Sequence, residues 1–243
     1  MPTNSALEWF PGIEKAGLPV PRTLMVPYDH RAYCAAMEGE GDLDYPSLHA
    51  AIVTAAEAIG YPVFIRTDLA SAKHHGPKAY RASNKDEIDH VLSATVEDNE
   101  VKFWLSHEGP KAFMVRGWLE LVAPFKAFGH HPIAREWRLF VTDKELLCSH
   151  FYWPEAAIQF YSVDTRPGRW KIQRTAMERQ SFPDDLVGMA IKAAAVQDGE
   201  EAWSVDFALD VDGKWWLIDM AVASSSWHPF DCQNKFGTER EGK

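Results

Sequence analysis

The sequence predicts an α+β fold in which antiparallel hairpins and helices follow one another along the chain. Residues 135–152 and 204–221 each read as two strands joined by a short turn, and the second turn carries Asp212-Gly213, a strong hairpin signal. Residues 86–96 have the spacing of an amphipathic helix. With 243 residues, the chain is long enough for one large domain or two lobes.

The first 45 residues contain five prolines and are predicted to form a small leading segment rather than an independent domain. Within this segment, 24–26 fits a short strand and 31–37 fits one or two helical turns. Residues 47–59 then have helical composition, with Ser47 as the expected N-cap and Gly60 as the end of the helix.

A buried strand is predicted at 62–68, where three apolar residues precede Arg66. The small-residue loop that follows, 69–76, carries Lys73 and the pair His74-His75. Small residues let backbone N–H groups approach an anion and lysine adds a mobile charge, so this strand and loop form a candidate phosphate cradle. The alternative is a surface loop that binds nothing. The two histidines lack a third partner at a fixed spacing, which favours a solvated pair over a metal site.

Two charged residues share a face of the hairpin at 135–152, because Glu136 and Arg138 alternate with Trp137 and Leu139. The simplest interpretation of the two charges is a surface ion pair worth less than about 1 kcal/mol. Before this hairpin, 112–119 reads as a strand interrupted by Arg116-Gly117. After it, 161–175 reads as irregular and 183–196 as a helix.

The hairpin at 204–221 brings two carboxylates together. A two-residue turn at Asp212-Gly213 places Asp206 directly opposite Asp219 on one face, whereas a three-residue loop would separate them. Like charges at such positions repel, and a hard cation such as Mg²⁺ would remove the repulsion. We therefore expect the fold to tolerate either Asp→Asn change. The alternative is a pair of solvated aspartates on an exposed face.

Charge and cysteine usage limit the classes of partner. The net charge of −10 disfavours binding to nucleic acid or to a membrane surface. Cys34, Cys148 and Cys232 are far apart and odd in number, so they suggest neither a metal spacing nor a disulfide framework, as expected in a reducing cytosol. The sequence has no apolar run of membrane-spanning length and no signal pattern at its start. These features predict a cytoplasmic protein.

The ordered pieces IGYPVFIRTDLASAK, MVRGWLEL, REWRLFV and WLIDMA resemble the ATP-grasp superfamily over roughly residues 46–230. They are most similar to two branches, the phage and bacterial group with arginine in the first phosphate position and the initiation-factor-2 assembly chaperones of the cell-division-cycle type. The resemblance implies two lobes of antiparallel sheet with helices and a nucleotide between the lobes. On this basis, 46–110 would form the N-terminal lobe and 111–243 the C-terminal lobe, after the leading segment 1–45.

The same resemblance implies a site for ATP and Mg²⁺. Arg66 and Lys73 would hold the phosphates, and Asp206 and Asp219 would bind the metal. The adenine linker would comprise Arg116, Gly117, Trp118 and Leu119. Ala221 stands where the family has a metal-binding asparagine, so we expect one firmly held ion rather than two.

Glu136 would contact the ribose, with Glu120 as a competing candidate. Arg138 would face the transferred phosphoryl group and, with Lys73, would act in catalysis. The function implied is an ADP-forming carboxylate–amine ligase that works through an acylphosphate and uses an unknown acid and amine. The alternative is an ATP-binding assembly factor that acts on a protein partner without ligase activity.

Overall fold

The computed structural model describes residues 4–40, 42–70, 80–106, 109–128, 131–161, 168–197, 199, 201–229 and 231–234. The chain forms two compact units. The first unit comprises 21–119 and 128–132, and the second unit comprises 1–20, 120–127 and 133–243. Both combine helices with antiparallel sheet, as the predicted α+β fold requires. No helix among the described residues has the length and apolar character that crossing a membrane requires.

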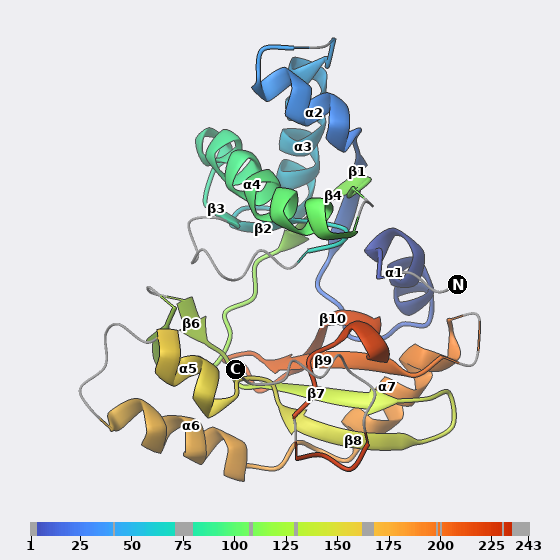
Figure 1. The fold of residues 1–243 in the computed structure, drawn as a ribbon, viewed down its shortest axis with the longest axis vertical. Coiled ribbons are helices and arrows are strands. Elements are labelled where there is room, and N and C mark those ends of the chain that lie inside the picture. Colours follow the sequence, from blue (N-terminus) through green and yellow to red (C-terminus); the bar gives the residue numbers. More distant parts are fainter. Residues whose placement is uncertain are drawn as a thin grey trace. The chain divides into compact units, whose positions relative to one another are not determined.

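The first unit contains a four-stranded antiparallel sheet in the order β1-β4-β2-β3. Its strands are β1 (Thr23–Pro27), β2 (Val63–Thr67), β3 (Arg81–Ala82) and β4 (Ala112–Gly117). Helices α3 (Tyr45–Ile59) and α4 (Ile88–Ser106) contact each other and pack on these strands (Figure 1). The short helix α2 (His30–Met37) and the 3₁₀ turn η3 (Lys85–Glu87) complete the unit.

Polar caps set the beginnings of these helices. The Asp44 side chain accepts a hydrogen bond from the Ser47 N–H at 3.1 Å, so Asp44 rather than Ser47 is the N-cap of α3. Gly60 ends this helix as predicted. Asn84 caps η3 in the same way, through the N–H of Asp86. The apolar faces of α3 and α4 meet the sheet in one buried cluster that includes Ile52, Ala56, Val63, Ile65, Ile88, Leu92 and Val115.

The structure groups the leading residues differently from the expected boundaries at 45 and 110. Residues 21–45 belong to the first unit because β1 pairs with β4 along its whole length. Strand β4 also pairs with β2, so it belongs to the same sheet. Helix α1 (Ala6–Lys15) belongs to the second unit, where the Gln197 side chain donates to the Trp9 carbonyl and the Lys192 side chain to the Ala16 carbonyl.

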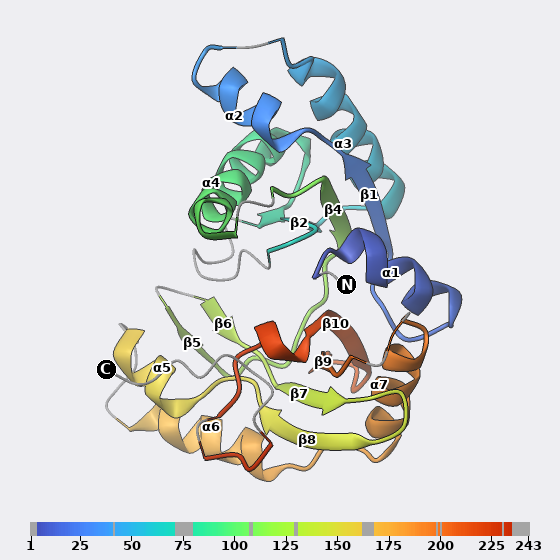
Figure 2. The same cartoon turned by 45° about the vertical axis from the view of Figure 1, so that its right-hand side comes forward.

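The second unit contains a four-stranded antiparallel sheet in the order β10-β9-β7-β8. Its strands are β7 (Glu136–Val141), β8 (Leu146–Phe151), β9 (Trp203–Leu209) and β10 (Trp215–Val222) (Figure 2). Helix α7 (Asp185–Ala195) contacts β7 and β9. The remaining elements of this unit are β5 (Phe125–Ala127), α5 (Glu155–Tyr161), α6 (Arg169–Arg179) and the 3₁₀ turn η4 (Ala223–Ser225). Strand β6 (His131–Ile133) is divided, since His131 and Pro132 belong to the first unit and Ile133 to the second.

The two faces of this sheet differ in polarity. Leu139, Val205 and Phe207 are fully buried and lie on one face, on which the Trp137 ring meets Phe182 just before α7. Alternation along the strands places Glu136, Arg138 and Asp206 on the opposite face. These polar residues therefore lie on the face of the sheet opposite to the face on which α7 packs.

The turn of the β9–β10 hairpin differs from the predicted two-residue turn. Asp210 and Lys214 close a three-residue loop, and the Asp210 side chain accepts from the N–H groups of Asp212 and Lys214. Gly213 follows with φ of 84°, as this longer turn requires. The register is therefore shifted by one at Leu209 and Trp215, and a bulge between Leu217 and Asp219 restores it. Asp206 and Asp219 are cross-strand partners as predicted. Their pairing results from the bulge, however, and not from a two-residue turn.

Helices α1, α5 and α6 were not predicted from the sequence. Pro11 lies inside α1, which explains why no helix was predicted in this proline-rich segment. Helix α6 falls partly in the stretch 161–175 that was read as irregular, and that prediction was wrong for the residues of the helix. Its sequence, RWKIQRTAMER, is mostly polar, and Trp170, Arg174 and Met177 supply its buried side.

Two glycine-to-alanine changes are expected to have opposite effects on stability. Gly213→Ala should lower the free energy of unfolding by about 1 kcal/mol, because alanine is strained at positive φ although nothing lies within 4 Å of the added methyl group. Gly188→Ala, in the middle of α7 and equally open, should raise it by about 0.5–1 kcal/mol through helix propensity. Urea denaturation of both variants tests this pair, and equal shifts would contradict the backbone assignment.

Candidate functional site

One row of polar side chains crosses all four strands of the second sheet. Asp219 on β10 is paired with Asp206 on β9, Asp206 with Arg138 on β7, and Arg138 with His150 on β8. Cross-strand partners project from the same face, so these four residues form a continuous polar row. Glu136, two residues before Arg138, lies beside the row and is almost completely buried.

Arg138 and Asp206 form a buried bidentate ion pair. The Arg138 Nε and Nη2 atoms each lie 2.8 Å from a different oxygen of Asp206, and the two side chains are 12% and 3% exposed. The Arg138 Nη1 atom donates to the Trp227 carbonyl at 3.2 Å, and the guanidinium lies over the Tyr152 ring. Burial lowers the pKa of Arg138, but the Asp206 carboxylate outweighs this effect, so the net shift is upward and the charge is retained.

This geometry corrects two expectations. The ion-pair partner of Arg138 is Asp206 rather than Glu136, and the pair is buried rather than on the surface. Asp206 is therefore not a solvated carboxylate whose charge is easily removed. Removing its charge would leave a buried guanidinium without its carboxylate, so the expectation that Asp206→Asn is tolerated no longer holds.

Asp219 lies beside this ion pair in a different environment. It is half-buried, and its Oδ1 atom accepts a hydrogen bond from the Met220 N–H at 3.1 Å. Ala221, two residues further along β10, is paired with Ser204 and contributes no oxygen side chain. Two adjacent carboxylates on one face fit a single hard cation such as Mg²⁺.

In the first unit, the predicted phosphate residue Arg66 lies on β2 and is 3% exposed. Its Nε atom donates to the Thr67 carbonyl at 3.1 Å, so a backbone contact orients the guanidinium. Lys73 lies outside the described residues, as do His74 and His75. The structure therefore describes one of the two cations of the predicted cradle.

The predicted adenine linker is already partly hydrogen-bonded within the first unit. The Gly117 N–H donates to the Arg22 carbonyl at 2.8 Å, and the Trp118 N–H donates to the Pro62 carbonyl at 3.2 Å. An interrupted strand can leave backbone groups free to pair with a base, but these two N–H groups are already used within the protein. Arg116 is buried at the end of β4, where its Nε atom donates to the Thr23 hydroxyl at 3.1 Å.

Aromatic residues around Trp118 form a small cluster that the sequence did not predict. The Tyr80 and Trp118 rings are nearly parallel with centroids 6.3 Å apart, and the Arg81 guanidinium lies 5.1 Å from the Trp118 ring centroid. The Tyr80 hydroxyl is 2.9 Å from the His131 Nδ1 atom, which fixes the tyrosine. Planar and cationic groups of this kind suit a flat, electron-rich ligand.

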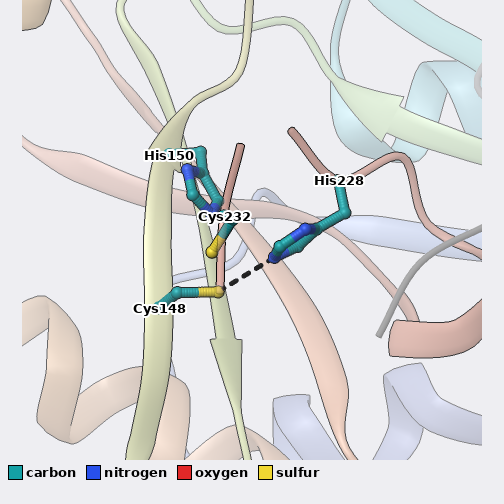
Figure 3. A group of neighbouring side chains, drawn as sticks. All are labelled: Cys148, His150, His228 and Cys232. Atoms are coloured by element: carbon teal, nitrogen blue, oxygen red, sulfur yellow. Dashed lines mark hydrogen bonds between the residues drawn. The ribbon is translucent and has the colours of Figure 1, made fainter. Parts of the chain in front are cut away.

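A second polar cluster lies on the same face as the polar row, at its β8 end. Cys148 and His150 of β8 meet His228 and Cys232 of the segment that follows η4 (Figure 3). Burial raises the pKa of the Cys148 thiol to about 12, with a further contribution from Cys232. Burial also lowers the pKa of His150 to about 4, and it lowers the pKa of His228. Both imidazoles are therefore neutral near pH 7.

The expectation from the sequence rested on the three cysteines alone, and the structure places two of them beside two histidines. The short spacings Cys148-x-His150 and His228-x₃-Cys232 are present in the sequence, and 77 residues separate the two pairs. Only the pairing of β7 with β8, and the return of the chain after η4, brings the pairs together. Cys34 lies in α2 of the first unit and takes no part.

Comparisons with known proteins agree with this architecture. Residues 131–230 match the family model of an ATP-grasp domain, family 2 of the clade designated R-2-K. The C-terminally truncated Cdc123 of Schizosaccharomyces pombe is 15% identical, with a TM-score of 0.55 over 90% of this chain and 83% of that one. No curated protein sequence matches the chain.

Two further solved structures are similar over 90% of this chain. The RimK domain ATP-grasp protein of Sphaerobacter thermophilus is 16% identical, with a TM-score of 0.48 and 59% of its length covered. Carboxyaminoimidazole ribonucleotide synthase of Aspergillus clavatus, in complex with ATP, is 17% identical, with a TM-score of 0.47. The chain spans only 44% of that enzyme.

These comparisons confirm the fold predicted from the sequence motifs: the protein has the ATP-grasp fold. Within that fold, residues 131–230 match the model of the clade named above. The matched residues include the whole polar row of the second unit, from Glu136 and Arg138 to Asp206 and Asp219.

Proposed function

We propose that this protein binds ATP with Mg²⁺ and uses it as an ADP-forming ligase that joins a carboxylate to an amine. The observation that carries the proposal is the polar row of the second sheet, in which a buried guanidinium and two carboxylates share one face of an ATP-grasp domain. An arrangement of both charge signs suits a ligand that combines phosphate oxygens with a divalent cation.

Arg138 is the residue we assign to the transferred phosphoryl group. A guanidinium has five N–H donors, and the bonds to Asp206 and to the Trp227 carbonyl use three of them. Within the part of the chain that the structure describes, the remaining donors are available to an oxyanion. Because Asp206 and Trp227 hold the guanidinium in place, little reorganisation is needed when charge develops on the phosphoryl oxygens.

The other residues have supporting roles. Arg66 and Lys73 would neutralise phosphate oxygens, and Glu136 would accept hydrogen bonds from the ribose hydroxyls. Trp118 would pack against the adenine, and the Leu119 backbone would pair with its edge, since the Gly117 and Trp118 N–H groups are already used. Asp206 and Asp219 would hold Mg²⁺, which supplies charge neutralisation to the phosphates when bound.

The proposed reaction has two steps. A carboxylate oxygen of the acid substrate attacks the γ-phosphorus of ATP, the bond to the β-phosphate oxygen breaks, and ADP and an acylphosphate result. The amine then attacks the acyl carbon, phosphate leaves with the bonding electron pair, and the nitrogen loses a proton. In both steps the protein mainly positions the reactants and stabilises charge.

A second function, an ATP-binding assembly factor without ligase activity, is favoured by one feature of the site. Ala221 has no side-chain oxygen, so it cannot bind a second metal ion. A protein with a single ion could still bind ATP without catalysing the ligase reaction. Calorimetric titration with Mg-ATP, followed by assays of ADP release with panels of acids and amines, separates the two functions. ADP release that requires both an acid and an amine supports the ligase. Binding without ADP release supports the assembly factor, and the absence of binding contradicts both.

Substitution of Arg66 tests the phosphate assignment. Arg66→Met should weaken ATP binding at least tenfold, equivalent to about 1.4 kcal/mol, because the variant keeps the buried aliphatic stem but loses the charge. Arg66→Lys is the matched control and should retain binding, since it keeps a cation at the position. Calorimetry measures both affinities, and thermal melting checks folding. Equal ATP affinity in the folded methionine variant and the parent would rule out the assignment.

A further inference from the structure

We propose that Cys148, His150, His228 and Cys232 bind one zinc ion in a structural, four-coordinate site of the second unit. The site is separate from the proposed Mg²⁺ site and does not depend on nucleotide binding. One sulfur or nitrogen atom from each of the four residues lies within 4.8 Å of the corresponding atoms of the other three.

The four ligands come from two segments whose geometry makes them converge. Cys148 and His150 are two residues apart on β8, so both project from the same face of the strand. His228 and Cys232 lie on the segment after η4, where the Cys232 N–H donates to the Pro229 carbonyl at 3.2 Å. Figure 3 shows the four side chains directed into one small space.

The segment that carries His228 and Cys232 is held against the sheet at several points. The Ser226 and Ser204 hydroxyl oxygens are 2.5 Å apart, and the Arg138 guanidinium donates to the Trp227 carbonyl. The Asn234 side chain donates to the Leu147 carbonyl at 2.5 Å. These contacts fix the segment on both sides of the two ligands, so the site is preorganised.

The distances fit a tetrahedral zinc ion after small side-chain movements. Zinc bonds of about 2.3 Å to sulfur and 2.0–2.1 Å to nitrogen place neighbouring ligand atoms about 3.3–3.8 Å apart. The Cys148 Sγ and His228 Nε2 atoms are 3.1 Å apart, and the His150 and His228 ring centroids are 4.9 Å apart. Changes of roughly an ångström complete the tetrahedron, within the range of side-chain rotation.

A buried polar atom in the cluster supports a metal rather than a purely hydrogen-bonded arrangement. The His150 Nε2 atom is buried and has no hydrogen-bond partner among the described residues. A buried polar group left in this state is destabilising, and coordination of a metal would satisfy it. A disulfide between the two cysteines is the competing arrangement, but it would leave both imidazoles without a role.

The chemistry of the ligands selects the metal. Two thiolates and two imidazoles form a soft to borderline set that favours zinc and disfavours Mg²⁺, which takes oxygen ligands. Two thiolates balance the 2+ charge of zinc, so the occupied site is neutral. A neutral site is compatible with the nearby Arg138 cation, whereas an uncompensated divalent ion would not be.

Metal analysis of the full chain tests the proposal directly. After purification without chelators and exhaustive dialysis, we expect about one zinc per chain. Cys148→Ser and Cys232→Ser should each lower the zinc content at least tenfold, and Cys34→Ser is the matched control that should retain it. Zinc retained equally by the two cluster variants and the control would overturn the proposal, as would a zinc-free parent protein.

A second measurement needs no variant and remains decisive where a variant fails to fold. Replacing zinc in the parent protein with Co²⁺ should give the intense visible bands of tetrahedral cobalt and a thiolate-to-cobalt charge-transfer band. Weak bands of octahedral cobalt would overturn the proposal, as would a Cys148–Cys232 disulfide found by mass spectrometry under non-reducing conditions. Because none of these readouts involves ATP, a failure of the zinc site is distinguishable from a failure of the proposed ligase function.

Discussion

Asp206→Asn should lower the free energy of unfolding by about 3–5 kcal/mol, the usual cost of breaking a buried ion pair by removing one partner. The Arg138 guanidinium loses one of its two hydrogen bonds to residue 206 and the negative charge that balances it. An asparagine can replace one acceptor oxygen but provides no negative charge. Arg138→Met should have an effect of similar size, since it leaves the Asp206 carboxylate buried.

A double-mutant cycle separates this effect from general damage to the core. Arg138→Met combined with Asp206→Leu removes both charges, so the loss should be clearly smaller than the sum of the single losses. Glu155→Gln is the control: its partner is Lys171 at 2.8 Å, both side chains are about half-exposed, and the change should cost less than about 1 kcal/mol. Urea denaturation followed by tryptophan fluorescence measures all of these variants. Additive losses in the double variant would contradict the ion-pair interpretation.

The sequence predicted the elements with the strongest local patterns. Apolar runs bounded by turns marked the strands of both sheets except β3, which was not predicted. Gly60 ended α3 because a residue without a side chain adopts its φ of 98° without strain. The pairing of Asp206 with Asp219 was also predicted, although through the wrong turn. A local turn signal does not reveal a bulge at the far end of the hairpin, because the bulge depends on how β10 packs.

The rest of the site depends on contacts that no local pattern contains. Arg138 and Asp206 are 68 residues apart, and their pairing follows from the position of β9 beside β7. Alternation along β7 correctly placed Glu136 and Arg138 on one face, but it could not identify the partner of the arginine. The cysteine and histidine pairs were missed for the same reason, since each pair alone is too short a signal for a metal site.

Helices α1 and α6 were missed for a different reason: their local sequences do not favour a helix. Helix α6 has only three buried residues among eleven, so its sequence lacks the apolar periodicity that marks an amphipathic helix. Helix α1 has a clear buried side of Ala6, Trp9, Phe10 and Ile13, but Pro11 concealed it. In both helices tertiary packing stabilises a conformation that local propensity opposes.

Asp219→Asn should weaken Mg²⁺-dependent ATP binding at least tenfold while leaving the fold intact. Asp219 differs from Asp206 in being half-buried, and its hydrogen bond from the Met220 N–H can be kept by an asparagine oxygen. The change also removes a like charge opposite Asp206, so we expect the free energy of unfolding to change by less than about 1 kcal/mol. Metal binding suffers because a neutral amide is a poorer ligand for a hard cation.

Calorimetric titrations with and without Mg²⁺ distinguish a metal ligand from a residue that contacts nucleotide. In Asp219→Asn the affinity for ATP should fall only when Mg²⁺ is present, whereas Asp212→Asn, at the exposed hairpin turn, should change neither affinity. Ala221→Asn should strengthen binding in the presence of Mg²⁺, because it adds an oxygen ligand two residues from Asp219. A folded Asp219→Asn variant that binds Mg-ATP like the parent would show that this carboxylate is not a metal ligand. Outright unfolding would show instead that Asp219 is structural, and either result would remove the proposed Mg²⁺ site from the second sheet.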